Sequence, residues 1–175
     1  MRRFYLPLIL LFLIVIEGVA LDLLPSSIMM EHWMVIPHWV LVFLMMIAII
    51  YDFENTYVSV LYAIFFGLLI DIVYTNVLGV YMFSYALVTY IIHGLNKLLH
   101  HNFITAILLT IAGIALADIG INIVYFFIGT SPMIWEEYAM NRLVPTIIAN
   151  GLFFIVLYII FKRKLVQWSY ERFDS

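Results

Sequence analysis

Long apolar segments dominate this sequence and set the strongest limit on what it can fold into. The 175 residues are 66% hydrophobic and 11% charged, and the mean hydropathy is +1.12. Soluble domains are about 45–50% apolar and about 25% charged. A chain of this length therefore has more apolar surface than a water-soluble fold can bury, and we expect its solvent to be lipid.

Six of the apolar segments are candidates for membrane-spanning helices, because a span needs about 20 apolar residues. The runs are continuous rather than alternating, which favours helices over strands. The second and fourth are short and need their aromatic ends to complete a crossing. The sequence predicts an all-α integral membrane protein, a six-transmembrane-helix bundle forming one polytopic domain over residues 1–175, with spans at about 4–24, 36–51, 57–75, 79–96, 103–128 and 143–161.

The basic residues predict the orientation of these spans. With the N-terminus inside, seven of the eight Lys and Arg residues fall in the cytoplasm, and Arg142 falls outside. This distribution follows the positive-inside rule and places both termini in the cytoplasm. Residues 2–3, the apolar stretch and residues 18–20 could also form a cleaved signal peptide. The apolar run is long for a signal peptide and continues through Leu24, which favours a retained helix.

Composition and spacing exclude several classes of function. The net charge of −3 is not concentrated in any run, which argues against nucleic acid as a partner. There is no cysteine, so disulfides, thiolate metal sites and cysteine nucleophiles are excluded. His38 is expected at the outer end of the second span and His93 at the cytoplasmic interface, and no histidine spacing predicts a metal site. We expect no catalytic residue, no metal and no cofactor.

Acidic residues inside the apolar segments are the candidate functional residues. At a rise of about 1.5 Å per residue, Glu17, Asp71 and Asp118 lie at one level in the outer half of the membrane. Asp22 lies closer to the outer interface. Ionisable residues inside a membrane indicate a functional site by default, and they face protein or water rather than lipid.

Two further residues extend this predicted cluster. Asn122 lies one turn beyond Asp118 on the same helix face, and Arg142 could reach an acid at this level. The cluster can act in transport or catalysis, but buried polarity without a catalytic motif favours helix packing or partner docking. The predicted cluster consists of Glu17, Asp71, Asp118, Asn122 and Arg142.

The surroundings of two acids are similar to each other. Residues 67–74 resemble residues 113–125, and each stretch has a glycine about one turn before its aspartate. Internal duplication produces such similarity, so we expect two three-helix halves in parallel arrangement.

The stretch GLLIDIVYTNVLG, residues 67–79, carries a resemblance to a known family. A glycine precedes an aspartate by four residues, a short turn ends in Leu-Gly, and the next helix contains Tyr85 and Tyr90. Together with the length and the six predicted spans, this pattern resembles the MreD family of bacterial rod shape-determining membrane proteins. The residues that match the family motif are Gly67, Asp71, Leu78 and Gly79.

The resemblance implies a non-enzymatic scaffold or regulator of cell elongation in the bacterial cytoplasmic membrane. Its implied partners are MreC, together with RodA, a class B penicillin-binding protein, MreB and membrane lipid, in organising lateral-wall peptidoglycan synthesis. The family is also similar to the substrate-binding components of energy-coupling-factor vitamin transporters, and a subunit of that kind is the alternative function. Those components carry an A-x-x-x-A pattern in the first helix, and residues 4–24 lack it.

Overall fold

The computed structural model describes residues 4–23, 33–53, 55–99, 102–130 and 135–171, with only the backbone described for residues 21–23. The side chain of Asp22 and three cations used in predicting the orientation, Arg2, Arg3 and Arg172, lie outside this description. Every regular element in the described residues is helical. The elements are α1 (Tyr5–Leu23), α2 (Trp39–Met46), η2 (Ile47–Tyr51), α3 (Val58–Tyr74), α4 (Val80–Leu98), α5 (Phe103–Ile128), α6 (Trp135–Tyr138), η3 (Ala139–Leu143) and α7 (Val144–Glu171), where η denotes a π-helical segment.

The second predicted segment differs from the structure. Residues 33–38 are not helical, α2 begins only at Trp39, and the helix changes to π-helical geometry at Ile47. The segment predicted at about 36–51 is therefore helical from Trp39 to Tyr51, three residues shorter at its start. Pro37 explains the late start, because a residue that precedes proline is disfavoured in the helical conformation. The other five predicted segments coincide with α1, α3, α4, α5 and α7, although α7 continues to Glu171.

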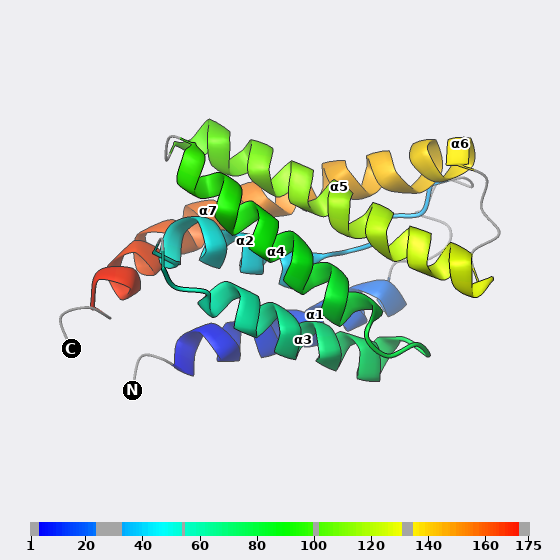
Figure 1. The fold of residues 1–175 in the computed structure, drawn as a ribbon, viewed down its shortest axis with the longest axis horizontal. Coiled ribbons are helices and arrows are strands. Elements are labelled where there is room, and N and C mark those ends of the chain that lie inside the picture. Colours follow the sequence, from blue (N-terminus) through cyan, green and yellow to red (C-terminus); the bar gives the residue numbers. More distant parts are fainter. Residues whose placement is uncertain (1–3, 24–32, 54, 100–101, 131–134, 172–175) are drawn as a thin grey trace.

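The short helix α2 is the centre of the molecule (Figure 1). Residues 40–48 have no exposed surface, and α2 contacts α1, α3, α4, α5 and α7. A helix that is apolar on all sides must be buried on all sides, and the sequence WVLVFLMM of α2 meets that condition. The other helices are therefore arranged around a central apolar rod.

The surrounding helices expose large apolar side chains on their outer faces. Examples on four different helices are Leu8, Phe65, Leu108 and Ile159, with exposed fractions of 64%, 57%, 60% and 75%. Within the described residues, α5 and the continuous helix of residues 135–171 are long and apolar enough to cross a membrane, and three apolar helices are shorter. Apolar surface of this extent is typical of a membrane protein.

The two ends of the bundle differ in charge. The start of α1, the loop after η2, the end of α4 and the end of α7 lie together at one end, on the left of Figure 1. This end carries Lys97 and the basic run of residues 162–164. Arg142 lies in η3, at the opposite end. We call these the basic end and the Arg142 end.

Candidate functional site

Asp71, in α3, caps the beginning of the neighbouring helix α4. Its carboxylate is fully buried and accepts hydrogen bonds from the backbone amides of Gly79 (2.9 Å), Tyr81 (2.9 Å) and Met82 (3.0 Å). The first amides of a helix have no acceptor within the helix, and the helix dipole favours negative charge at that end. The carboxylate therefore does for α4 what a capping side chain does in an isolated helix.

Two glycines of the same stretch make this arrangement possible. A Cβ atom on Gly67 would lie 2.7 Å from the Cα atom of Met82, so a larger residue would force α3 and α4 apart. Gly79 has a φ of 97°, a left-handed conformation that other residues adopt only with strain. Leu78 is 69% exposed. Three of the four motif residues thus hold one helical hairpin together.

Glu17 caps the beginning of the central helix α2, as Asp71 caps the beginning of α4. It lies in α1 with 4% of its surface exposed, and its Oε2 atom accepts the backbone amide of Val40 at 3.0 Å. Val40 belongs to the first turn of α2, whose amides would otherwise be unsatisfied inside the bundle. Two of the buried acids are therefore caps supplied by one helix to another.

Asp118, in α5, has different partners. Its carboxylate is fully buried and accepts hydrogen bonds from Arg142 (3.0 Å) and Tyr138 (2.6 Å), and it lies 3.3 Å from Nε2 of His38. The guanidinium supplies the opposite charge that a buried carboxylate needs. We call Asp118, His38, Tyr138 and Arg142 the Asp118 hub.

His38 connects the Asp118 hub to two more helices. A carboxylate oxygen can only accept, so Nε2 donates to Asp118, and Nδ1, 2.8 Å from the hydroxyl of Tyr85, accepts from it when the ring is neutral. The backbone amide of His38 also donates to Oδ1 of Asn150 at 2.7 Å. Sequence reasoning gave His38 no role in this network, because an isolated histidine has no motif. The available signal was Pro37, which lies directly before His38 and indicates that a helix begins near this point.

The non-helical residues 33–38 are held by side chains of α7. Asn150 donates to the carbonyl of Ile36 at 2.8 Å, and the hydroxyl of Thr146 accepts the amide of Ile36 at 3.1 Å. Buried backbone amides and carbonyls that lie outside a helix need partners elsewhere. Thr146 and Asn150, one turn apart on α7, supply partners for the backbone of Ile36 and His38.

The structure divides the predicted polar cluster among separate partners. Asp71 bonds to α4, Glu17 bonds to α2, and Asp118 bonds to Arg142 within its own hub. Asn122 is buried in α5, one turn beyond Asp118. The similar glycine–aspartate stretches also differ, because Gly67 is approached by the backbone of α4, whereas Gly113 is approached by the side chain of Met45.

These contacts describe what the site can do chemically. Both oxygens of Asp118 are occupied by protein donors, and the carboxylates of Asp71 and Glu17 are bound by helix amides. In the described part of the chain, no group of three or more His, Asp or Glu side chains is placed to hold a metal. The buried acids therefore fix the relative positions of helices and of residues 33–38.

Comparison with known proteins gives an independent assignment. A family sequence model described as "rod shape-determining protein MreD" matches residues 2–168. The rod shape-determining protein MreD of Bacillus subtilis (strain 168) is 27% identical over 176 residues, and the match covers 100% of both chains. No solved structure matches this chain.

Proposed function

Because this chain belongs to the MreD family of rod shape-determining proteins, we propose that it is a non-enzymatic scaffold of the bacterial cell-elongation machinery. In this role it organises lateral-wall peptidoglycan synthesis together with MreC. RodA, a class B penicillin-binding protein and MreB are further proposed partners. The observation that carries the proposal is the family match over nearly the whole chain, and the inward-directed bonding of the buried acids supports it.

The proposal includes six crossings of the bacterial cytoplasmic membrane by α1, residues 33–51, α3, α4, α5 and α7, within a single domain. Exposed apolar side chains on the outer helices support contact with lipid. The basic end, with Lys97 and residues 162–164, then faces the cytoplasm, in agreement with the positive-inside rule. The irregular residues 33–38 complete the second crossing, in which Thr146 and Asn150 bond to the backbone of Ile36 and His38.

The buried polar residues then act on partners indirectly. Asp71 and Asp118 are fully buried, so neither can touch a partner directly in this conformation. The Asp118 hub joins the start of α2 to α5 and η3, and the Asp71 cap joins α3 to α4. We propose that these bonds keep the outer surface of the bundle in one shape, on which a transmembrane helix of a partner docks.

Complementation tests the proposal in a Bacillus subtilis strain that lacks its own MreD. The chain is expected to restore rod shape and to co-purify with MreC. Asp118→Asn at equal membrane abundance is expected to weaken both. The matched control is Gly94→Ala, since a Cβ there meets no atom within 4 Å. Round cells with normal amounts of the unaltered chain would contradict the proposal.

The alternative is a substrate-binding subunit of an energy-coupling-factor type vitamin transporter. A cavity of about 720 Å³ at the basic end is the observation in its favour. None of Glu17, Asp71, Asp118 and Arg142 lines this cavity, so the predicted polar cluster is not its binding site. Vitamin uptake that depends on this chain and a coupling ATPase, in cells whose shape does not depend on the chain, would favour the alternative.

A further inference from the structure

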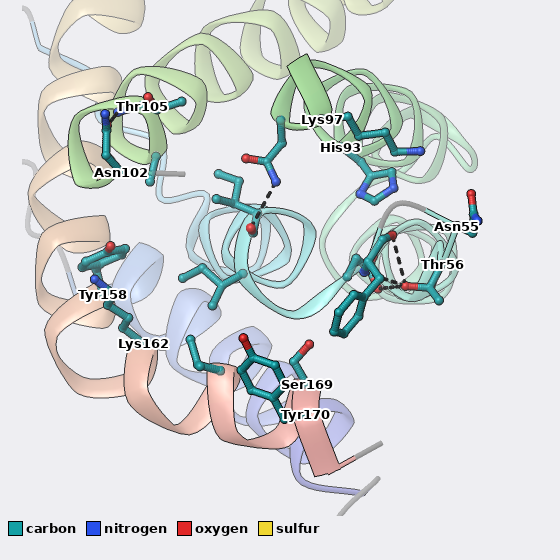
Figure 2. Close-up of a pocket in the computed structure, with 17 residues that line it drawn as sticks. Asn55, Thr56, His93, Lys97, Asn102, Thr105, Tyr158, Lys162, Ser169 and Tyr170 are labelled. Carbon is teal, nitrogen blue, oxygen red and sulfur yellow. Dashed lines mark hydrogen bonds between the residues drawn. The ribbon is translucent and has the colours of Figure 1, made fainter. Parts of the chain in front are cut away.

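A cavity of about 720 Å³ lies at the basic end of the bundle, next to the end of the central helix. Its lining includes Ile49 and Ile50 of η2, which ends at Tyr51, together with residues of α4, α5 and α7. Figure 2 shows labelled residues of α4, of the start of α5 and of α7 arranged around the end of the central helix. In the proposed orientation this cavity lies at the cytoplasmic face.

Three of the last four carbonyls of the central helix have a side chain against them. The C-terminal carbonyls of a helix lack partners within it and carry the negative end of its dipole. Three side chains bond to or lie against these carbonyls: Nδ1 of His93 is 3.4 Å from the Ala48 carbonyl, Asn96 donates to Ile49 at 3.1 Å, and Ser169 donates to Tyr51 at 2.7 Å. A cation placed at this helix end would therefore find few carbonyls without a hydrogen-bond partner.

Two buried side chains present unpaired atoms in the lining of this cavity. His93 and Asn96 are 2% and 5% exposed. Nε2 of His93 and Oδ1 of Asn96 have no hydrogen-bond partner among the described residues, and both residues line the cavity. Buried polar atoms in native proteins are nearly always paired. A hydrogen-bond donor on a bound molecule would pair them.

The charge of the lining is positive. Lys97 and Lys162 line the cavity, and their ammonium groups lie over the rings of Tyr57 and Tyr158, at 5.2 and 4.9 Å. Within the described residues neither lysine forms an ion pair. Asp52, the acid in the lining, has both carboxylate oxygens bound by donors from the start of α3. Among the residues that the structure describes, the lining therefore offers two cations and no carboxylate with an unbound oxygen.

We propose that this cavity binds a phosphate ester that also carries a hydroxyl group, of the kind found in the glycerol head group of an anionic phospholipid. The phosphate would lie near one of the two lysines, which Figure 2 shows on opposite sides of the end of the central helix; lysines attract anionic head groups at a membrane surface. The hydroxyl would donate to Oδ1 of Asn96 or to Nε2 of His93. Apolar side chains of the lining, Ile49, Ile50 and Val166, would contact the hydrocarbon part.

Binding of short-chain lipids to the full chain in a neutral detergent tests this inference, with calorimetry as the measurement. Dihexanoyl phosphatidylglycerol is expected to bind about tenfold more tightly than dihexanoyl phosphatidylcholine. Dihexanoyl phosphatidylmethanol has the phosphate but no head-group hydroxyl and is expected to lie between them. The variant Lys97→Ala/Lys162→Ala is expected to bind phosphatidylglycerol about tenfold more weakly.

The matched control removes the same charge from the same end of the bundle. Arg163 and Lys164 do not line the cavity, so Arg163→Ala/Lys164→Ala is expected to change affinity less than about twofold. Equal losses in both double variants, or equal binding of the choline and glycerol lipids, would overturn the inference. Equal binding of the methanol and glycerol lipids would overturn the role of the hydroxyl. Competition by sn-glycerol 3-phosphate would support a water-soluble ester as the ligand, and its absence would support a lipid.

Discussion

The molecule contains two fully buried aspartates whose surroundings are opposite in character. Asp71 bonds to backbone amides only 8 to 11 residues further along the chain. Asp118 bonds to side chains that lie 20, 24 and 80 residues away. One acid completes a local hairpin, and the other joins segments that the sequence keeps far apart. The comparison teaches that equal burial of a carboxylate does not imply an equal role.

The largest effect is expected from Asp118→Leu. Removing the carboxylate leaves the partly buried Arg142 guanidinium without its counter-charge, and breaking a fully buried ion pair in this way costs about 3–5 kcal/mol, which is the upper value here. SDS-induced unfolding in mixed micelles measures the loss. Asp118→Asn retains an acceptor and is expected to lose less. A free energy of unfolding within 1 kcal/mol of the unaltered chain for Asp118→Leu would show that the Asp118 hub does not stabilise the bundle.

Asp71→Ala is expected to have the second largest effect. Three amides at the start of α4 would lose their acceptor, at a cost of about 1–3 kcal/mol for buried donors left unpaired. Hydrogen exchange is expected to rise in the first turn of α4 while α2 stays protected. Equal rises in both helices would mean that the Asp71 cap is not local, and the contrast with Asp118 would fail.

Gly67→Ala probes the close contact that positions Asp71. The added Cβ would lie 2.7 Å from the Met82 Cα atom, and such overpacking costs about 1–3 kcal/mol. Gly94→Ala in α4 is the control, because it adds a methyl group where no atom lies within 4 Å. The same unfolding assay compares the two. Equal stability of the two variants would contradict the close approach of α3 and α4.

Leu78→Ala is expected to have the smallest effect. Leu78 matches the family motif but is 69% exposed, and exposed positions without special contacts change stability by about 0.5 kcal/mol or less. Co-purification of MreC is a separate measurement on the same variant. A large loss of stability would place Leu78 with the other three motif residues in the hairpin.

The sequence predicted the local features of the fold well. Continuous apolar runs predicted α1, α3, α4, α5 and α7, and the spacing of Gly67, Asp71 and Gly79 marked residues that lie together in the α3–α4 hairpin. Local signals sufficed because the Asp71 cap and its helix are close in sequence.

The long-range features were not predictable in the same way. Spacing within one helix cannot reveal that His38 lies against Asp118, 80 residues away. Equal depth in the membrane suggested one cluster of acids, but depth does not specify which donors each carboxylate meets. Glu17 bonds to Val40 and Asp118 lies against His38, so these two acids from different helices meet the start of α2 through different donors.

A double-mutant cycle between Asp118 and Arg142 tests most directly whether long-range polar bonds hold this bundle together. Free energies of unfolding would be measured for Asp118→Asn, Arg142→Gln and the double variant in mixed micelles. We predict a coupling energy of about 1 kcal/mol or more, because the two groups share one ion pair whose carboxylate is fully buried. Additive effects, within about 0.5 kcal/mol, would contradict the account.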